Sequence, residues 1–507
     1  MAQHSPPAGV PGSRAEPPQR GAESGGLVET KGVMAPLAGR RDFLIKPGTT
    51  MHDSDPEGKR LPIKLDSTSN GEFAPVSLWP ANIEAKRLAH EAAATNAKRL
   101  GCSKRAFLTS SCGAASTLLA FNAANAAAGR TGGFFELPRD AVLDMQLARA
   151  QVGPARQEFI LDVQGHFIDT PKGNSKSAEV FLKDVFMDSD TDVMVLSFVP
   201  SARDAEPVTI QAADEVRRLV DKLEGTHRLL LHGRVNPNQP GDLEGMDELH
   251  EKWGISAWKT YTQYGPNGKG YFLHDDVGIR FIEKARALGV KNICIHKGLP
   301  FGPRSYEHSQ CSDIGVVARR YPDVNFLIYH SGFVSTVTER AYDASGKSDG
   351  IDTLITSLRK HQVKPNSNVY AELGSTWRFL MRDPEQAAHA LGKLVVACGE
   401  NNVLWGTDSI WYGSPQDQIQ AFRAFQIAAE LRERHGYPEM TPALRAKIFG
   451  LNAANVYGLT PTEVKRYTAR DSVARKRMAY LEKPDPHFRT YGPKTRREFL
   501  RVFDPAG

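Results

Sequence analysis

Eight short apolar runs recur along the chain from residue 159 onward, and amphipathic stretches separate them. The runs cover residues 159–166, 192–200, 228–237, 255–261, 292–298, 325–332, 368–374 and 402–408. Between them, stretches such as AADEVRRLVDKLEG, DVGIRFIEKARALGV and QDQIQAFRAFQIAAELRERHG repeat apolar residues at the spacing of a helix. Near-continuous apolar strands that alternate with helices form parallel sheets buried on both faces. The pattern therefore predicts an α/β fold, a (β/α)8 TIM barrel over residues 159–459.

Most of these runs end on a residue that can bind a metal ion or carry a proton. In chain order, the residues are Gln164, His166, Lys259, His296, His330, Glu372 and Asp408. In a (β/α)8 barrel the carboxyl ends of all strands meet at one mouth. Burying an ionisable group without a partner costs free energy. Such a group at the end of a core strand is therefore not expected to serve the structure alone. The seven residues are therefore predicted to form one active site.

The order of these motifs resembles the amidohydrolase superfamily, in the branch of amidohydrolase-related hydrolases and metal-dependent non-oxidative decarboxylases. The motifs are DVQGHF, WK, IHKG, YHSG and WGTDSIW at successive strand ends, and FGLNAANVYGL in the last helix. The resemblance implies that His166, His296 and Asp408 bind a divalent metal, with Zn²⁺ preferred and Mn²⁺ as the alternative. It makes His330 a further ligand or a catalytic imidazole. Lys259 falls where some members carry a carboxylated lysine, with a structural ion pair as the alternative.

Gln164 departs from this resemblance. The family's first strand carries His-x-His, or a carboxylate in the first place, whereas this chain has Gln164-Gly165-His166. A neutral amide oxygen is a weaker ligand than imidazole, so we expect one metal ion, a weak site or none. Gln164 could instead orient the substrate by hydrogen bonding. Glu372 is a second candidate for substrate binding, with a supporting or helix-capping role as the alternative.

Several aromatic residues follow the strand ends and are candidates to line a substrate pocket. They are Trp258, Tyr264, Trp377, Trp411 and Tyr412, with simple packing as the alternative. Trp258 and Trp411 are the two predicted to contact substrate.

Three functions compete. The leading hypothesis is a metal-dependent hydrolase that cleaves a C–O or C–N bond of a small organic substrate. Asp408 would take a proton from a metal-activated water, and His330 or Lys259 would stabilise the oxyanion. The runner-up is a metal-dependent decarboxylase of an aromatic or unsaturated carboxylic acid. The third is a barrel that lost its metal with Gln164 and serves as a binding protein.

The regions that flank the barrel differ from it in composition. Residues 1–102 are rich in Pro, Gly, Ser and Ala, which predicts a largely disordered extension with one helix across Ala81 to Leu100. Residues 130–158 are expected to form a linker with a helix. Thr441-Pro442 is a good start for the last barrel helix. Residues 460–507 are expected to add a helical arm on the barrel surface.

Residues 103–129 have the layout of a secretory signal, with a basic pair, an Ala-rich stretch and small residues at the end. The segment resembles a twin-arginine export signal with Lys104 before Arg105. Export to the periplasm is therefore predicted, with a cytoplasmic protein as the alternative. An Ala-rich helix of the folded protein and a membrane anchor are the other interpretations. Polar residues interrupt the stretch, which lacks the roughly 20 apolar residues of a span, so no stable membrane span is expected.

The composition of the chain limits the kinds of binding partner that are expected. The 507 residues are 40% hydrophobic and 24% charged, with a net charge of +6, which is ordinary for a globular protein. The sequence has no long basic stripe with interleaved aromatics, so nucleic acid is not an expected partner. The five cysteines form no CxxC pair, which argues against a disulfide framework or a structural zinc site. A small-molecule substrate is expected, and a homo-oligomer is left open.

Overall fold

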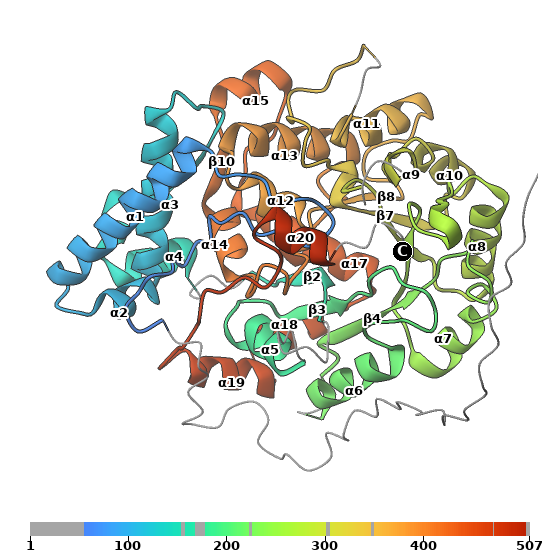
Figure 1. The fold of residues 1–507 in the computed structure, drawn as a ribbon, viewed down its shortest axis with the longest axis horizontal. Helices are drawn as coiled ribbons and strands as arrows, with labels where there is room; N and C mark the ends of the chain where they lie inside the picture. Colours follow the sequence, from blue (N-terminus) through green and yellow to red (C-terminus); the bar gives the residue numbers. More distant parts are fainter. Residues whose placement is uncertain are drawn as a thin grey trace, which may run out of the picture. The chain divides into compact units, whose positions relative to one another are not determined.

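The computed structural model describes residues 55–153, 158–167, 178–222, 226–300, 305–345, 349–469 and 471–502. Eight parallel strands are each hydrogen-bonded to the next one along the chain (Figure 1). The strands are β2 (Leu161–Gly165), β3 (Val193–Leu196), β4 (Leu229–Arg234), β5 (Ala257–Tyr261), β6 (Asn292–His296), β7 (Asn325–Tyr329), β8 (Val369–Glu372) and β9 (Val403–Leu404). One strand lies within each of the eight predicted runs, so the predicted barrel is confirmed.

The segment that follows β9 closes the barrel against β2. The Val163 N–H donates to the Trp405 carbonyl at 3.0 Å, and the Asp408 N–H donates to the Gln164 carbonyl at 3.0 Å. The buried Asp162 carboxylate adds a side-chain link, since it accepts from the Thr407 N–H at 3.1 Å. These bonds bring the carboxyl ends of the first and last strands side by side.

The sheet separates two apolar layers because successive residues of a strand point to opposite faces. In β6, Cys294 points into the barrel interior, whereas Ile293 and Ile295 point outward to the helices. The covering helices are α5 (Ala178–Leu182), α6 (Ile210–Asp221), α7 (Met246–Trp253), α8 (Asp276–Ala287), α9 (Tyr306–Ser309), α10 (Ile314–Arg320), α11 (Ile351–Lys360), α12 (Thr376–Leu380), α13 (Pro384–Cys398), α14 (Gln416–Ala424), α16 (Pro442–Ala446) and α17 (Asn452–Val456). Burial on both faces explains the near-continuous apolar runs.

One predicted helix is interrupted. The stretch QDQIQAFRAFQIAAELRERHG forms α14, the short strand β10 (Phe425–Ile427) and α15 (Ala429–His435). β10 pairs in antiparallel fashion with β1 (Gly133–Phe135), which lies in the expected linker. The prediction of one continuous helix is wrong here because pairing with a distant strand outweighs local helix propensity.

Four helices precede the barrel, and α3 packs against α1, α4 and α14 (Figure 1). They are α1 (Pro80–Arg99), α2 (Lys104–Leu108), α3 (Ser111–Ala127) and α4 (Met145–Val152). The helix expected across Ala81 to Leu100 is confirmed. The prediction of disorder is wrong for residues 55–102, because this part buries apolar side chains such as Ile63 and Leu65 in the main core. Residues 1–54 lie outside the described residues.

Residues 103–129 form α2 and α3, and most of the α3 side chains are buried. Ala115 and Leu118 are fully buried. A Cβ atom on Gly113 would lie 2.5 Å from the Phe107 carbonyl oxygen, so α3 meets the preceding helix at very close range. The segment therefore takes the form of the folded helix that the sequence left open, and export stays a prediction. No helix in the described part of the chain is both long and apolar enough to cross a membrane.

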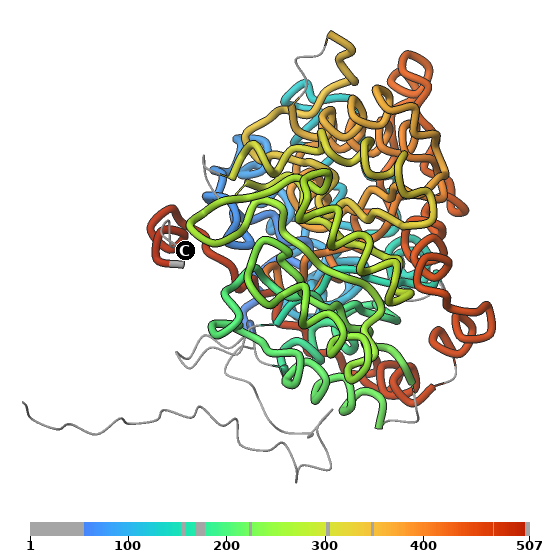
Figure 2. The backbone as a smooth tube through the Cα atoms, turned by 90° about the vertical axis from the view of Figure 1, so that its right-hand side faces the viewer, coloured from blue at the N-terminus to red at the C-terminus, as the bar shows by residue number. Residues whose placement is uncertain are grey.

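The C-terminal arm meets the N-terminal part of the chain. It contains α18 (Pro461–Ala469), α19 (Ser472–Tyr480) and α20 (Arg496–Val502), which confirms the predicted helical arm. Between α19 and α20, the Pro493 carbonyl accepts from the Ser69 N–H at 2.8 Å, and the Tyr491 N–H donates to the Trp411 carbonyl at 2.9 Å. Figures 1 and 2 both show the early part of the chain (blue) beside the late part (red).

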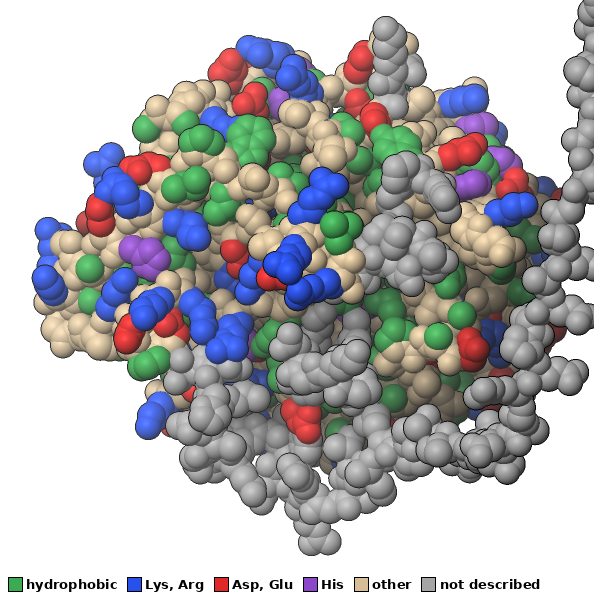
Figure 3. All heavy atoms as spheres, viewed as in Figure 1, with side chains coloured by type: hydrophobic (Ala, Val, Ile, Leu, Met, Phe, Trp, Pro, Cys, Tyr) green, Lys and Arg blue, Asp and Glu red, His purple; other side chains and the backbone are tan. Residues whose placement is uncertain are grey.

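Charged side chains of both signs are mixed on the face of the molecule seen in Figure 3. Lys and Arg gather most visibly over α20, which carries exposed arginines at 496, 497 and 501. Acidic side chains interrupt the basic ones elsewhere on this face, in keeping with the small net charge.

Residues 55–79, here called the strap, are tied to the barrel by buried polar contacts. The Lys64 ammonium donates to the Tyr412 carbonyl at 2.7 Å and lies 3.2 Å from the Asp417 carboxylate. Asp66 accepts from Arg378 at 2.9 Å and from the Thr490 hydroxyl at 3.0 Å. Asp66 therefore links the strap to both the barrel and the C-terminal arm.

The Asp66 contacts predict an acid-sensitive contribution to stability. Burial raises the pKa of Asp66, but the Arg378 charge and hydrogen bonds from Thr68 and Thr490 outweigh it and lower the pKa from 3.8 to about 2. The ionised carboxylate therefore stabilises the fold above about pH 4, and this stabilisation is lost as the pH falls toward about 2. Asp66→Asn should cost about 1 kcal/mol at neutral pH.

Thermal melts of wild type and Asp66→Asn between about pH 3 and pH 7 test this. The gap in melting temperature should stay nearly constant from pH 7 to about pH 5 and should narrow as the pH falls below about 4. The control is Asp323→Asn at an exposed ion pair with Arg286 and Lys291, which should change stability little at any pH. A gap for Asp66→Asn that stays constant across the range contradicts the prediction.

Candidate active site

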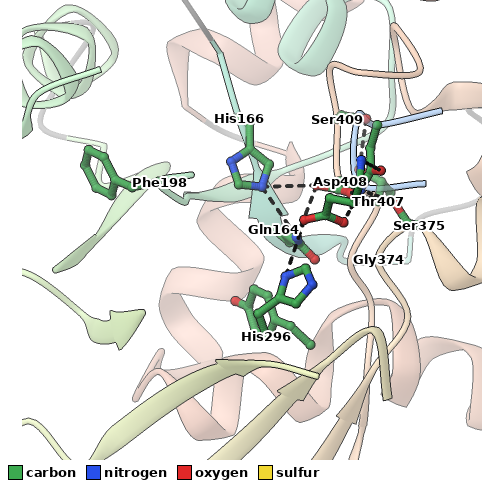
Figure 4. Close-up of polar contacts among 12 residues, drawn as sticks. Gln164, His166, Phe198, His296, Gly374, Ser375, Thr407, Asp408 and Ser409 are labelled. Atoms are coloured by element: carbon green, nitrogen blue, oxygen red, sulfur yellow. Dashed lines mark hydrogen bonds and ion pairs between the residues drawn. The ribbon is translucent and has the colours of Figure 1, made fainter. Parts of the chain in front are cut away.

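The seven predicted strand-end residues converge at the carboxyl end of the barrel. Gln164 lies in β2 and His166 follows it, Lys259 lies in β5, and His296 ends β6. His330, Glu372 and Asp408 belong to the ends of β7, β8 and β9. Each of the seven is at most 4% exposed. Figure 4 shows His166, Gln164 and Asp408 facing one another, with Ser375 next to Asp408. The mouth is thus a buried cluster of polar side chains.

The Asp408 carboxylate is the centre of this cluster. Its Oδ1 atom lies 3.1 Å from His166 Nε2 and 3.1 Å from Gln164 Nε2. Its Oδ2 atom accepts from Asn70 Nδ2 at 2.8 Å and from the Ser375 hydroxyl. Burial alone would raise the pKa of Asp408, but the hydrogen bond and charge of His166 outweigh burial and hold it well below its usual value. Asp408 is therefore an ionised carboxylate in a dry site.

His330 is held in one orientation by its neighbours. Its Nδ1 atom lies 2.6 Å from the Gly374 carbonyl oxygen, which can only accept, so Nδ1 carries the proton. In the neutral ring, the Nε2 lone pair then faces the mouth. Burial lowers the pKa of His330 to about 4, which keeps the ring neutral at pH 7.

Glu372 helps to hold His330 in this orientation. One of its carboxylate oxygens accepts from the His330 N–H at 3.0 Å, and the other accepts from the Gly374 N–H at 2.6 Å. Burial raises the pKa of Glu372 to about 8. Both carboxylate oxygens thus accept hydrogen bonds from backbone N–H groups. This is the supporting role that the sequence left open for Glu372.

Four residues at the mouth have a left-handed backbone conformation without being glycine. Their φ angles are 64° for His330, 54° for Ser331, 52° for Ser375 and 56° for Asp408. Such a conformation costs about 1–3 kcal/mol at a non-glycine residue and is found mainly at functional sites. The strain lies at the ends of β7, β8 and β9, where the candidate chemistry lies.

Lys259 points into the barrel from β5 and is fully buried. Its ammonium lies 3.6 Å from the centre of the Tyr329 ring and 4.9 Å from that of Tyr261. No hydrogen-bond acceptor for Nζ exists among the described residues. Burial lowers the pKa of Lys259 to about 8, so its ammonium loses a proton more easily than that of an ordinary lysine. The two aromatic rings, and not a structural ion pair, hold the ammonium in place.

The predicted aromatic pocket is only partly supported. Trp258 lies in the outer core and its indole N–H donates to the Val290 carbonyl at 2.9 Å, so the prediction that it binds substrate is wrong. The reason is strand alternation: because Lys259 points inward, Trp258 must point outward. Trp377 likewise lies in the outer core. Trp411 lies 6.3 Å from the His166 ring, and the Tyr412 hydroxyl is 2.7 Å from that of Ser375.

The structure adds residues that the sequence did not reveal. Glu72 of the strap has one carboxylate oxygen 3.4 Å from His296 Nδ1 and the other 3.9 Å from His330 Nε2. Asn70 bonds to Asp408, as described above. Both come from a Pro-rich, polar segment far ahead of the barrel, where no local pattern marks a functional residue. Ser375 was missed for a similar reason, since a lone serine after a strand is common.

The donor atoms fit a divalent metal ion. Buried imidazoles together with a carboxylate suit a borderline ion such as Zn²⁺ or Mn²⁺. With bonds of about 2.0–2.2 Å, two ligands of one ion lie within roughly 4.4 Å of each other. His166 Nε2 and Asp408 Oδ1 meet this condition at 3.1 Å. The donor atoms of Glu72, His296 and His330 form a second group, all within 4.8 Å of one another.

Two adjoining cavities lead to the mouth from the side of β4. The larger, of about 260 Å³, is lined in part by Phe198, Glu206 and Arg234. The same three side chains line a smaller cavity of about 10 Å³ that also contacts His166. Arg234 is neutralised there by Glu206 at 2.7 Å and by Asp242 at 3.0 Å. The larger cavity therefore lies close to His166, and the space that contacts His166 itself is about the size of one water molecule.

Comparisons with known proteins identify a family and several similar solved structures. Residues 162–459 match the family model described as Amidohydrolase. A search of curated protein sequences finds no match. Similar solved structures include 2,6-dihydroxybenzoate decarboxylase from Rhizobium, with 16% identity, a TM-score of 0.37 and coverage of 60% of this chain and 99% of that one.

Two further solved structures are similar to about the same share of the chain. One is a putative 2-pyrone-4,6-dicarboxylic acid hydrolase from Pseudomonas putida, with 15% identity, a TM-score of 0.37 and coverage of 59% of this chain and 97% of that one. The other is an amidohydrolase from Burkholderia multivorans with bound zinc, with 16% identity, a TM-score of 0.37 and coverage of 60% and 100%.

Proposed function

Because the match over residues 162–459 makes this chain a member of the amidohydrolase family of enzymes, we propose that it is a metal-dependent hydrolase. Its substrate is a small organic molecule with a C–O or C–N bond at a carbonyl carbon. The observation that carries the proposal is the ionised Asp408 carboxylate, 3.1 Å from His166 in a buried mouth. A carboxylate in that place can accept the proton that water loses in hydrolysis.

His166, His296 and Asp408 would hold the metal, with Zn²⁺ preferred and Mn²⁺ as the alternative. Bound there, the ion would act as a Lewis acid and lower the pKa of a water molecule toward about 7. Asp408 would take a proton from the attacking water as the water oxygen bonds to the carbonyl carbon. The C–O or C–N bond would then break as Asp408 returns this proton to the leaving group. The buried Lys259 could stabilise negative charge on the carbonyl oxygen. The neutral His330 presents a lone pair to the mouth, so it suits the alternative role of a further metal ligand.

Decarboxylation of an aromatic or unsaturated acid is the second candidate. It is favoured by the near-complete burial of the mouth, because decarboxylation consumes no water. In that reaction the bond between the ring or vinyl carbon and the carboxyl group breaks, CO₂ leaves, and a proton adds to the carbon. Burial raises the pKa of Glu372 to about 8 and lowers that of Lys259 to about 8, so either group could supply this proton.

One experiment separates the two reactions. The metal content of purified protein is measured first, and esters, lactones, amides and aromatic acids are then offered in H₂¹⁸O. A hydrolase places ¹⁸O in the product acid, whereas a decarboxylase releases labelled CO₂ from a ¹³C-carboxyl substrate. Protein that carries no metal and turns over none of these compounds would instead favour the binding-protein hypothesis.

Gln164 offers a direct test of the metal site. Replacing Gln164 by His supplies a stronger donor beside His166 and Asp408, so Zn²⁺ affinity should rise about tenfold or more. Competition with a chelating dye measures the affinity. The matched control is Gln164→Met, which keeps the length but offers a poor ligand, and it should not bind more tightly than wild type. Equal affinities for the His variant and wild type would count against a metal beside Gln164.

Export is a separate proposal, supported only by the layout of residues 103–129. N-terminal sequencing of protein isolated from its native cell tests it. An amino terminus near residue 129 on protein outside the cytoplasm is the expected result. An intact segment on cytoplasmic protein would refute it and would agree with the buried position of α3.

A further inference from the structure

The strap, which lies outside the region that matches the family, brings a carboxylate into the barrel mouth. Glu72 lies ahead of residues 162–459. Its side chain is only 17% exposed, with oxygens 3.4 Å from His296 Nδ1 and 3.9 Å from His330 Nε2. The three donor atoms all lie within 4.8 Å of one another. A movement of a few tenths of an ångström would bring them to the spacing of ligands around one ion.

The hydrogen bond of His330 leaves a lone pair on the ring nitrogen that is nearer to Glu72. His330 Nδ1 donates to the Gly374 carbonyl at 2.6 Å, so its Nε2 atom presents a lone pair toward Glu72. A backbone carbonyl in this position is the usual partner that orients a metal-bound imidazole. A carboxylate and an imidazole lone pair repel each other unless a cation or a proton lies between them. A divalent cation between the Glu72 carboxylate and the His330 lone pair would remove this repulsion.

The strap holds Glu72 in this position before any ligand binds. The Asn70 side chain accepts from the Glu72 N–H at 3.0 Å, and its amide donates both to the Glu72 carboxylate and, at 2.8 Å, to Asp408. The Ser69 hydroxyl donates to the Phe73 carbonyl at 2.5 Å and closes the turn. Asn70 thus joins Glu72 to the Asp408 carboxylate through one side chain.

A second group with suitable residue types lacks this property. Asp184, Asp188 and His487 also have donor atoms within 4.8 Å. However, His487 Nδ1 accepts from the Arg489 N–H at 3.0 Å, so in the neutral ring Nε2 carries the proton. This Nε2 lies 2.9 Å from the Tyr491 hydroxyl and 3.0 Å from an Asp184 oxygen. No imidazole lone pair remains for an ion there.

We propose that Glu72 and His330 are further ligands of the divalent metal that His166, His296 and Asp408 would hold, with His296 common to both groups, and that the bound ion fastens the strap over the barrel mouth. This rests on the metal dependence of the proposed function. Glu72 would supply the charged ligand that Gln164, a neutral amide on β2, does not. The consequence is that metal binding and closure of the mouth by residues 55–79 are a single event.

The test compares Zn²⁺ binding to chelator-treated wild type, Glu72→Gln and Glu72→Asp by calorimetry. Glu72→Gln should bind about 10- to 100-fold more weakly, and Glu72→Asp should recover part of the affinity. The matched control is Glu57→Gln, because Glu57 is also on the strap but is 67% exposed and pairs only with Lys59 in the structure. It should bind like wild type. Circular dichroism verifies that each variant is folded.

Hydrogen exchange provides a readout that does not depend on activity. In wild type, Zn²⁺ should slow exchange in peptides that cover residues 65–76, and Glu72→Gln should lose this protection. If wild type binds Zn²⁺ but Glu72→Gln binds equally well, or the strap gains no protection, the Glu72 proposal is overturned while the metal-dependent function survives. If wild type binds no divalent metal at all, both proposals fall.

Discussion

Asp408→Asn is expected to reduce turnover by about 10²- to 10⁴-fold, the usual loss when a proton-transfer group is removed. The carboxylate accepts hydrogen bonds from four side chains: His166, Gln164, Asn70 and Ser375. An amide at this position has no charge, and its NH₂ group would face a donor. The change therefore removes both a candidate metal ligand and the proton acceptor while it preserves the size of the side chain.

The measurement is kcat on the best substrate from the labelled panel, together with the metal content of the variant. Asp276→Asn, at an exposed position in the first turn of α8, is the control and should leave kcat unchanged. Asp408→Asn protein that is folded and turns over at the wild-type rate would remove Asp408 from the mechanism. The enzyme proposal would then lose the observation on which it rests.

Asp471→Ala should destabilise the fold by about 3–5 kcal/mol, because it leaves a buried cation without its partner. The Arg228 side chain is fully buried, and two of its nitrogens contact the two Asp471 oxygens at 2.5 and 2.6 Å. A third nitrogen donates to the Asp192 carbonyl at 2.5 Å. Asp471 also accepts from the Ala474 N–H at 2.8 Å and so caps α19. One carboxylate thus holds the C-terminal arm to the barrel.

Urea unfolding of wild type, Asp471→Ala and the double variant Arg228→Met/Asp471→Ala measures this. The double variant should recover part of the loss, since the unpaired charge is the main cost. A loss below about 1 kcal/mol for Asp471→Ala, or a double variant less stable than the single one, would show that the pair contributes little.

The barrel and most of its mouth could be predicted from sequence because both depend on local patterns. A parallel strand buried on two faces must be apolar along its length, so each strand can be recognised in the sequence from a short apolar run. Its end is equally visible, since the first ionisable side chain marks where the strand leaves the core. His296 and Asp408 were found in this way. Strand alternation, also local, could have excluded Trp258 once Lys259 was assigned to the interior.

Pairing between distant segments was not visible in the same way. The stretch around Phe425 has the spacing of a helix, yet it forms β10 because β1 lies beside it. The helix α3 has the layout of an export signal, and its small side chains fit equally well against α1. In both cases the local sequence is compatible with two structures, and long-range packing decides which of them forms.

What the sequence determined by itself, therefore, is the eightfold alternation of strands and helices and the polar residues at the strand ends. What only the tertiary structure decided is the use of the strap, whose Asn70 and Glu72 contact Asp408, His296 and His330. The physical reason is that a loop residue gains its role from the position of the loop, and that position is set by distant contacts such as Asp66 with Arg378 and Thr490. No periodicity within the strap encodes those contacts.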